Sequence, residues 1–485
     1  MYNAYITEIK NVRCHPNADK LDLVDCFGNT VCVSHGEFAE GDLAVYFPTD
    51  GQLSEEFCQV HDLVRRKDDA GNQCGGYLEP GKRNIRAIRL RGERSDGLAM
   101  PLRCLEYTGI DIRTLEAGFA FTTINGKEIC CKYIPRSNRR NQSCNAGNHT
   151  RKKKVPVAPL FAEHADTEQL AYNLSAFKPG DEIEITLKMH GTSGRTARLP
   201  VLKGYTDSFG CRAGNAIRHL LNKMGCYHGE DRHDGEPIYE DGYVSGTRRV
   251  VLEDYSGGFY GNNSFREKHS KIFEGKLMKG ETVYYEIVGF TDSGAPIMGD
   301  GNNEKVGKDF VKEYGKTTTF SYGCSRDGWG NAVYKTDKWG NGVVEHKEVP
   351  ISDVYVYRMT MINEDGFVVE YTPDFMRYRC EQMGVKTVPV FTKFIIPEET
   401  YYPKDITRPI KVEAGEFVKQ WAEKFYAGPD PVGKTHTREG VVVRIVNRPK
   451  FCAYKHKNFE FKVLEGLIKD TAAAPEMEES QEVIE

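Results

Sequence analysis

Short runs in which apolar and polar residues alternate dominate the first 135 residues of the chain. They include YITEI, LDLVDCF, TVCVS, LAVYF, IRAIRL and LAMPL, and turn-forming sequences such as NAD, FGN, EGD and SDG separate them. Alternation with a period of two is typical of strands that bury one face. Short strands at this spacing predict an all-β module over residues 1–135, a small closed barrel such as an OB fold.

From residue 157 onward the pattern mixes helices and strands. Helices are predicted in NAIRHLLNKM, which Gly225 closes, in TPDFMRYRCEQM, which Thr372 and Pro373 open, and in AGEFVKQWAEKFYA, which Gly428 closes. Strands are predicted in EIEITLK, TVYYEIVGF, DVYVYRMTMI, FVVEY, EGVVVRI and FCAYKHK. The pattern therefore predicts an α+β second domain over residues 157–470.

Two stretches have no periodic pattern. Residues 136–156, RSNRRNQSCNAGNHTRKKKVP, are polar and basic and predict a linker between the two domains. Residues 471–485, TAAAPEMEESQEVIE, are acidic and poor in apolar side chains, so they cannot bury enough surface to fold and predict a disordered tail.

Composition narrows the class of protein. The 485 residues carry a net charge of −4, which excludes a uniformly basic coat for nucleic acid but leaves room for a local basic groove. The 14 cysteines follow no framework spacing, which is typical of reduced thiols and predicts a cytoplasmic protein of a bacterial or virus-infected cell. No apolar run of about 18 residues exists and the N-terminus has no signal-peptide pattern, so no membrane association is expected.

The stretch KRNIRAIRLRGERSDG, residues 82–97, places six cations around apolar residues in the first module. A strand with one cationic face suits the phosphate backbone of a nucleic acid. The same pattern also suits a solvated edge strand whose charges prevent pairing with another chain. Both interpretations fit the residues equally well.

Lys188 ends the predicted strand EIEITLK. The two isoleucines and Leu187 share one face of this strand, so Lys188 projects from the opposite, polar face. The sequence HGTSG follows at once, and its glycines allow the backbone to turn close to a ligand. A lysine in this position can form a covalent adduct, although K-x-x-G by itself fits an ordinary surface lysine as well.

Two later strands carry polar or aromatic groups suited to a nucleotide. Glu286 lies between apolar neighbours in TVYYEIVGF, where a carboxylate needs a partner such as ribose hydroxyls. Tyr355 and Tyr357 share a face of DVYVYRMTM, where a flat ring can stack on a base. For Tyr355, packing in the core of the sheet is the stronger interpretation.

The C-terminal strands add a carboxylate and two cations. Glu439 directly precedes the buried-looking strand GVVVRI, and hard oxygen ligands of this kind suit Mg²⁺ beside phosphates. Lys455 and Lys457 share one face of AYKHK, with Phe459 and Phe461 in the same parity. Two lysines aimed into one pocket repel each other unless an anion such as a nucleotide phosphate joins them. Two solvated lysines on an edge strand would also explain the pair.

Taken in order, these segments resemble a known family. The sequences are KMHG (188–191), SGTR (245–248), YEIVG (285–289), VYRM (356–359), EGVVVR (439–444) and KHK (455–457). They look like motifs I, Ia, III, IIIa, IV and V of the covalent nucleotidyltransferase superfamily, which contains polynucleotide ligases and mRNA capping enzymes. The resemblance implies a nucleotidyltransferase (ATP-grasp-like ligase) domain of antiparallel sheets with flanking helices.

The resemblance also implies roles for individual residues. Lys188 would attack the α-phosphate of ATP and carry AMP as a phosphoramidate. Glu286 would bind ribose hydroxyls, and Tyr357 would stack on adenine. Arg248 would contact the ribose or a phosphate, with the adjacent Arg249 as the alternative.

Motifs IV and V would handle the phosphate and the metal. Glu439 would help hold a catalytic Mg²⁺ or Mn²⁺, while Lys455 and Lys457 would grip the α-phosphate. AMP would then pass to a 5′-phosphate end, and a neighbouring 3′-OH would displace it to seal the strand.

The N-terminal sequences NADKLDLVDC and RNIRAIRLRGERSDGLAMP resemble the OB module of the Deinococcus-type RNA ligases. DNA ligases and capping enzymes carry their OB domain after motif V, whereas only 28 residues follow Lys457 here. We therefore expect an ATP-dependent RNA ligase acting on RNA ends, at nicks in duplex RNA or an RNA–DNA hybrid. The alternatives are a DNA ligase, a capping-type nucleotidyltransferase and a non-catalytic RNA-binding protein.

Three features depart from the family pattern or have no assigned role. Ser193 stands in motif I where related ligases often carry Asn or Arg. The insertion at residues 205–240 between motifs I and Ia has no role that the residues indicate. The sequences DGWGN and KWGNG, between Tyr322 and Glu345, predict a hairpin over the site.

Overall fold

The computed structural model describes residues 2–67, 71–134, 155–226, 231–252, 255, 260, 263–336, 342–402 and 410–468. The predicted acidic tail lies outside these residues, as does the predicted basic linker except for its last two positions. Within the described part of the chain, no helix is both long and apolar enough to cross a membrane. The architecture is mixed α and β with mostly antiparallel sheets, so the predicted α+β class is confirmed.

The N-terminal module is built almost entirely from short antiparallel strands. One sheet has the order β11-β5-β1-β12, and a second has the order β2-β3-β4. The strands are Ala4–Glu8 (β1), Lys10–Cys14 (β2), Leu21–Cys26 (β3), Asn29–Ser34 (β4), Leu43–Phe47 (β5), Gly51–Leu53 (β6), Arg65–Lys67 (β7), Gln73–Gly75 (β8), Ala87–Leu90 (β9), Glu93–Asp96 (β10), Leu98–Pro101 (β11), Ala120–Phe121 (β12), Thr123–Ile124 (β13), Lys127–Glu128 (β14) and Cys130–Lys132 (β15). The helices are Glu55–Val60 (α1) and the 3-10 turns Leu102–Thr108 (η1) and Ile112–Thr114 (η2).

Strand β5 shows how the alternating sequence builds this module. Val45 and Phe47 pack into one hydrophobic cluster, while Ala44 and Tyr46 pack into another on the opposite face of the strand. Successive side chains of a strand point to opposite faces, so β5 is the wall between two small cores.

The second domain contains two antiparallel sheets. The first has the order β16-β30-β29-β17-β28, and the second has the order β19-β18-β20-β25-β26, with β27 beside β25. The strands of the first sheet are Glu168–Gln169 (β16), Glu182–Lys188 (β17), Val390–Ile395 (β28), Gly440–Ile445 (β29) and Ala453–Lys457 (β30). The strands of the second are Thr192–Tyr205 (β18), Pro237–Gly246 (β19), Glu281–Gly289 (β20), Ser352–Ile362 (β25), Val368–Glu370 (β26) and Lys386–Thr387 (β27).

Helices and small strand pairs surround these sheets. They are Phe209–Lys223 (α2), Ser264–Lys271 (α3), Lys308–Tyr314 (α4), Pro373–Met383 (α5), Ala414–Glu423 (α6), Phe459–Ile468 (α7), Leu170–Tyr172 (η4), Leu174–Ala176 (η5), Asn303–Lys305 (η6), Gly301–Asn302 (β21), Thr317–Thr318 (β22), Trp329–Thr336 (β23) and Gly342–Glu348 (β24). Helix α5 begins as predicted, with the Thr372 hydroxyl accepting a hydrogen bond from the Phe375 N–H at 3.3 Å. Helix α6 ends at Glu423, before the predicted stop at Gly428.

Helix α7 corrects the prediction for the residues after Lys457. Phe459 and Phe461 are not in strand register with the two lysines, because the strand ends at Lys457 and a helix starts at Phe459. The side chain of Asn458 accepts a hydrogen bond from the Glu460 N–H at 2.8 Å and satisfies a free donor at the helix start. Apolar residues at alternating positions hid this change from the sequence pattern.

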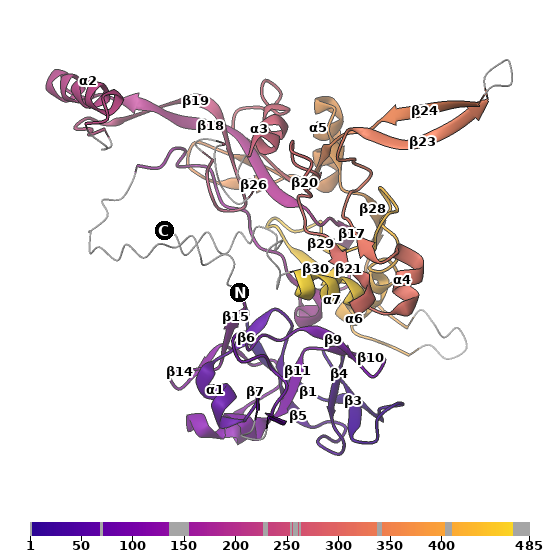
Figure 1. Ribbon diagram of the computed structural model, residues 1–485. Coiled ribbons are helices and arrows are strands. Elements are labelled where there is room, and N and C mark those ends of the chain that lie inside the picture. Colours follow the sequence, from indigo (N-terminus) through magenta and orange to yellow (C-terminus); the bar gives the residue numbers. More distant parts are fainter. Residues whose placement is uncertain are drawn as a thin grey trace.

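The cationic stretch of the first module lies against the second domain (Figure 1). Arg89 and Arg94 form ion pairs of 3.1 and 2.7 Å with Glu460 of α7, and both guanidinium groups lie over the Phe459 ring. Lys462 of the same helix pairs with Asp96 at 2.6 Å. These contacts give Arg89 and Arg94 a role at the interface between the modules, which neither sequence interpretation included.

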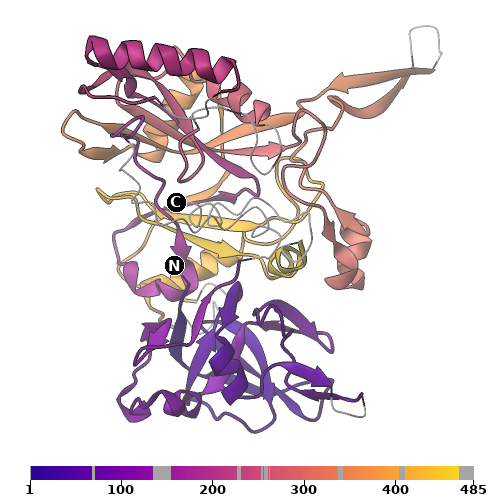
Figure 2. The ribbon, with the colours of Figure 1, turned by 60° about the vertical axis from the view of Figure 1, so that its left-hand side comes forward.

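Two hairpins project from the second domain in opposite directions (Figure 1). One is the pair β18–β19, with helix α2 of the insertion at its end, and Figure 2 shows this helix lying across the outer edge of the molecule. The other is the pair β23–β24, which confirms the hairpin predicted between Tyr322 and Glu345. Its predicted position over the site is wrong, because the hairpin points away from the body of the protein (Figure 1).

Candidate functional site

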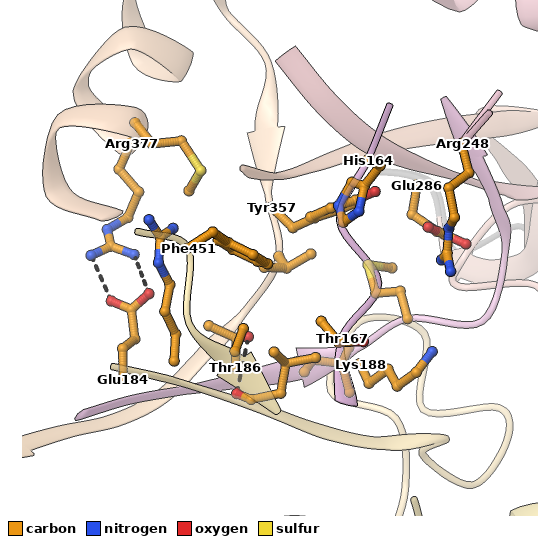
Figure 3. A pocket seen from close by; sticks show the side chains of 17 residues that line it. His164, Thr167, Glu184, Thr186, Lys188, Arg248, Glu286, Tyr357, Arg377 and Phe451 are labelled. Carbon is orange, nitrogen blue, oxygen red and sulfur yellow. Dashed lines mark hydrogen bonds and ion pairs between the residues drawn. The ribbon is translucent and has the colours of Figure 1, made fainter. Parts of the chain in front are cut away.

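A pocket lies between the two sheets of the second domain (Figure 3). Four residues singled out from the sequence line it: Lys188, Arg248, Glu286 and Tyr357. Lys188, Arg248 and Glu286 gather at one end, while the ion pair of Arg377 with Glu184 closes the other (Figure 3). Segments far apart in the sequence thus bring these four residues to one pocket, whereas Glu439, Lys455 and Lys457 are not among its lining residues.

Lys188 occupies the end of β17, where the chain leaves the first sheet. Ile183 and Ile185 of β17 are buried in a core cluster, and the opposite face of the strand carries Lys188 toward the pocket, as predicted. The Lys188 Nζ lies 2.7 Å from Oε1 of Glu439. The Lys188 side chain is 23% exposed, so it remains accessible to a ligand in the pocket.

Glu439 is the buried counter-charge of the site. Burial by itself would raise its pKa, but Lys188 and Lys457 outweigh that effect and hold the pKa of Glu439 far below its ordinary value. Its Oε2 has no hydrogen-bond partner among the described residues, and His190 Nδ1 lies 3.6 Å away. A buried carboxylate with one open oxygen is suited to a hard cation.

The position of Glu439 depends on the glycine that follows it. Gly440 has a φ of +152° and pairs directly with Lys457 of β30. A Cβ atom at Gly440 would collide with the backbone carbonyl of His456. Only glycine therefore allows β29 and β30 to approach closely enough to set Glu439 beside Lys457.

Lys457 and Lys455 lie near Glu439 but differ in their surroundings. Lys457 Nζ lies 3.3 Å from Glu439 and 2.7 Å from Glu465. Burial would lower the pKa of Lys457, yet the two carboxylates raise it above its ordinary value. Burial, together with repulsion from Lys457 and Lys188, lowers the pKa of Lys455 to about 8. The charged form of Lys455 is thus destabilised, and a bound anion would stabilise it.

Arg248 and Arg249 share one carboxylate. Their guanidinium groups pair with Asp166 at 2.7 and 3.1 Å. Of the two arginines, Arg248 lines the pocket. The geometry therefore favours Arg248 over Arg249 as the residue that faces a bound ligand.

Glu286 and Tyr357 come from adjacent strands of the second sheet, β20 and β25. The Ser193 hydroxyl donates to Glu286 Oε2 at 3.4 Å. Tyr357 lies at the pocket wall (Figure 3). Tyr355 is buried in the core of the domain, as the stronger interpretation of that residue predicted.

Several lining residues carried no signal in the sequence. His164, Thr167, Arg377 and Phe451 border the pocket although none stands in a recognised motif. The segment around His164 has no periodic pattern, and its place depends on the pairing of β16 with β30 and on a hydrogen bond from the His164 N–H to the Arg248 carbonyl. A pattern search along one sequence has no means of finding such a residue.

Comparisons with known proteins agree with this architecture. A family described as an OB-fold domain matches residues 3–102. The chain is similar to the structure of Naegleria gruberi RNA ligase with PPi, at 16% identity and a TM-score of 0.51, covering 94% of this chain and 96% of that one. A mutant of the same ligase with AMP and Mn gives 16% identity and a TM-score of 0.50, covering 96% and 99%. No curated protein matches the chain. At this identity the likeness shows a shared fold, and the OB-fold match confirms the predicted N-terminal module.

Proposed function

We propose that the protein is an ATP-dependent RNA ligase that carries AMP covalently on Lys188. One observation carries the proposal: the Lys188 ammonium lies 2.7 Å from the buried carboxylate of Glu439, at the edge of a pocket lined by Arg248, Glu286 and Tyr357. A surface lysine has no need of a buried counter-charge beside a pocket. The arrangement suits a nucleophile that must be held in place until its substrate arrives.

Each predicted site residue has a chemical task in this reaction. Tyr357 offers a flat ring on which adenine stacks, and Glu286 accepts hydrogen bonds from ribose hydroxyls. Arg248 contributes a fixed positive charge near the sugar and phosphates. Lys455 and Lys457 hold the α-phosphate and neutralise the charge that develops on it during attack.

The covalent step exchanges one bond to phosphorus for another. Lys188 loses a proton to become a neutral amine, and its Nζ forms a bond to the α-phosphorus of ATP. The bond between that phosphorus and the bridging oxygen breaks, and pyrophosphate leaves with the electron pair. The second proton on the nitrogen is released, so Lys188 ends as a phosphoramidate of AMP.

A divalent cation fits the donor set. Glu439 presents a buried, ionised carboxylate whose Oε2 has no hydrogen-bond partner in the described part of the chain. When bound, Mg²⁺ or Mn²⁺ would supply Lewis-acid neutralisation of the phosphate charge. Glu439 would bind that ion, and its attraction for the Lys188 ammonium would weaken because its charge is then shared with the metal.

RNA is the proposed strand because of the N-terminal module and the fold relatives. The OB-fold match covers residues 3–102, and OB folds often bind single-stranded nucleic acid. The similar structures are of Naegleria gruberi RNA ligase and contain PPi, or AMP and Mn. The proposed substrate is therefore a 3′-OH and a 5′-phosphate RNA end, joined at a nick after AMP passes to the 5′-phosphate.

Labelled nucleotides and a panel of nicked duplexes test this function. Incubation with α-labelled ATP and Mg²⁺ or Mn²⁺ should label the protein on a denaturing gel, whereas α-labelled GTP should not. Sealing should occur on duplexes with RNA on both sides of the nick. Label from GTP alone would favour capping chemistry, sealing only of all-DNA nicks would favour a DNA ligase, and no label from either nucleotide would leave a non-catalytic protein.

ATP affinity should fall as the pH rises above about 8. The pKa of Lys455 is lowered to about 8, so its charge is present below that pH and lost above it. A bound phosphate favours the charged form, so binding takes up a proton and weakens by up to about ten-fold per pH unit. The measurement is the Kd of ATP between pH 7.5 and 9.5. Lys455→Arg keeps its charge throughout and should remove the fall; an equal fall in that variant would refute the assignment.

A further inference from the structure

His164 lies at the pocket but has no part in the chemistry described so far. It precedes β16, and its backbone N–H donates to the Arg248 carbonyl at 3.1 Å, which fixes the segment beside the strand end that carries Arg248. The residue is only 8% exposed and lines the pocket, where Figure 3 shows its ring close to Tyr357.

The surroundings of the His164 ring are aromatic. Its centroid lies 5.1 Å from that of Tyr284, 5.3 Å from that of Tyr357 and 6.1 Å from that of Phe451, in tilted or edge-on contacts. Neither ring nitrogen has a hydrogen-bond partner among the described residues. Buried polar groups nearly always have a hydrogen-bond partner. Two ring nitrogens that lack one at the wall of a pocket therefore indicate that the partner belongs to the bound ligand.

The ring is neutral at physiological pH. Burial lowers the pKa of His164 to about 3, and the nearby Arg248 and Arg358 guanidinium groups act in the same direction. A neutral imidazole has one N–H donor and one nitrogen acceptor. It is therefore matched to a neutral polar group rather than to a phosphate anion, for which the lysines and Arg248 are available.

We propose that His164 is a nucleoside-recognition residue, whose imidazole exchanges a hydrogen bond with the nucleoside bound beside Tyr357. This inference rests on the proposed function and extends it to a residue outside the recognised motifs. The chemistry it requires, a hydrogen-bond donor or acceptor on a neutral group, occurs at the edge of the adenine base and at the ribose hydroxyls. ATP analogues that lack either the adenine amino group or a ribose hydroxyl distinguish these two possible partners.

Calorimetric titration of the full chain with ATP tests the inference. His164→Phe keeps an aromatic ring of similar size and removes both nitrogens, and it should weaken ATP binding roughly ten-fold. Two analogues identify the source: 2′-deoxy-ATP lacks a ribose hydroxyl, and purine riboside triphosphate lacks the 6-amino group. The analogue that lacks the contacted group should bind the wild type about ten-fold more weakly and lose nothing further in His164→Phe.

A second variant covers the case in which His164→Phe does not fold. His164→Ala leaves a space for free imidazole, and millimolar imidazole should restore part of its ATP affinity. The matched control is His269→Phe, which removes another buried histidine that bonds Ser352 at 2.8 Å and does not line the pocket. ATP should bind this control as tightly as the wild type.

The outcomes separate this inference from the proposed function. Wild-type protein that binds ATP and is labelled, while both His164 variants bind ATP within two-fold of it, overturns the role of His164 alone. The role of His164 is also overturned if His164→Phe weakens the binding of both analogues as much as it weakens the binding of ATP. If the wild type binds no ATP, the proposed function fails and this inference fails with it.

Discussion

Replacing Lys188 with alanine is expected to abolish the attachment of AMP to the protein. The amine that forms the bond to phosphorus is then absent, and no other residue of the pocket offers a nucleophile at the same position. Loss of a covalent nucleophile lowers the rate by at least about a thousand-fold. The measurement is the rate of label transfer from α-labelled ATP, followed on denaturing gels.

Two further variants make the result specific. Lys188→Arg keeps a positive charge beside Glu439, so the buried carboxylate stays paired, but the guanidinium remains protonated and cannot attack. It should be as inactive as the alanine variant while melting close to the wild type. Lys279→Ala removes an exposed lysine that pairs with Glu364 at 3.1 Å and does not line the pocket, and labelling should be unchanged. Undiminished labelling of Lys188→Arg would rule out Lys188 as the nucleophile.

Replacing Glu439 with glutamine should lower labelling by roughly a hundred-fold or more and also destabilise the protein. The neutral amide cannot hold a divalent cation beside the phosphates, so more metal should be needed to reach half-maximal rate. Removing the charge of Glu439 leaves Lys188 and Lys457 with less counter-charge. The free energy of unfolding should therefore fall, by about 3 kcal/mol or less because Lys457 still pairs with Glu465.

The stability difference should depend on pH in a defined direction. The pKa of Glu439 is lowered in the folded protein, so its stabilising effect is fully present above the unfolded value of about 4.3 and is lost progressively as the pH falls from there toward the much lower folded-state pKa. In denaturant titrations, the difference in the free energy of unfolding between the wild type and Glu439→Gln should therefore shrink steadily as the pH is lowered below that value.

Glu465→Gln is the matched control for Glu439. Glu465 also pairs with Lys457, at 2.7 Å, and its side chain is 12% exposed, against 2% for Glu439. Of these two carboxylates, Glu439 is the one that forms an ion pair with Lys188. It should lose stability without changing the metal dependence of labelling. If both glutamine variants shift the metal dependence equally, Glu439 has no special relation to the cation.

The candidate site was largely predictable because most of its residues sit on, or directly beside, strands with a strong apolar pattern. The strand EIEITLK was predicted with the bounds that β17 has, and its parity placed Lys188 on the correct face. Glu439, Lys455 and Lys457 follow from neighbouring strands in the same way. Regular strands tie side-chain direction to sequence position, and that relation survives folding.

Features that depend on distant partners were not predictable. The sequence predicted that Arg89 and Arg94 face a nucleic acid or solvent. Their partner Glu460 lies more than 360 residues away, so the sequence pattern could not reveal it. Helix α7 was missed because Phe459 and Phe461 alternate as strand residues do, and only the turn at Asn458 redirects them. His164 stands outside every periodic segment, so its place at the pocket comes from tertiary packing alone.

Peptide mass mapping of the wild-type protein, after incubation with ATP and Mn²⁺, tests the central claim most directly. Trapping under mildly alkaline conditions preserves a phosphoramidate, so the adduct can be assigned to one residue. We expect AMP on Lys188 and on no other lysine. AMP on a different residue, or a protein that binds ATP and stays unmodified, would contradict it.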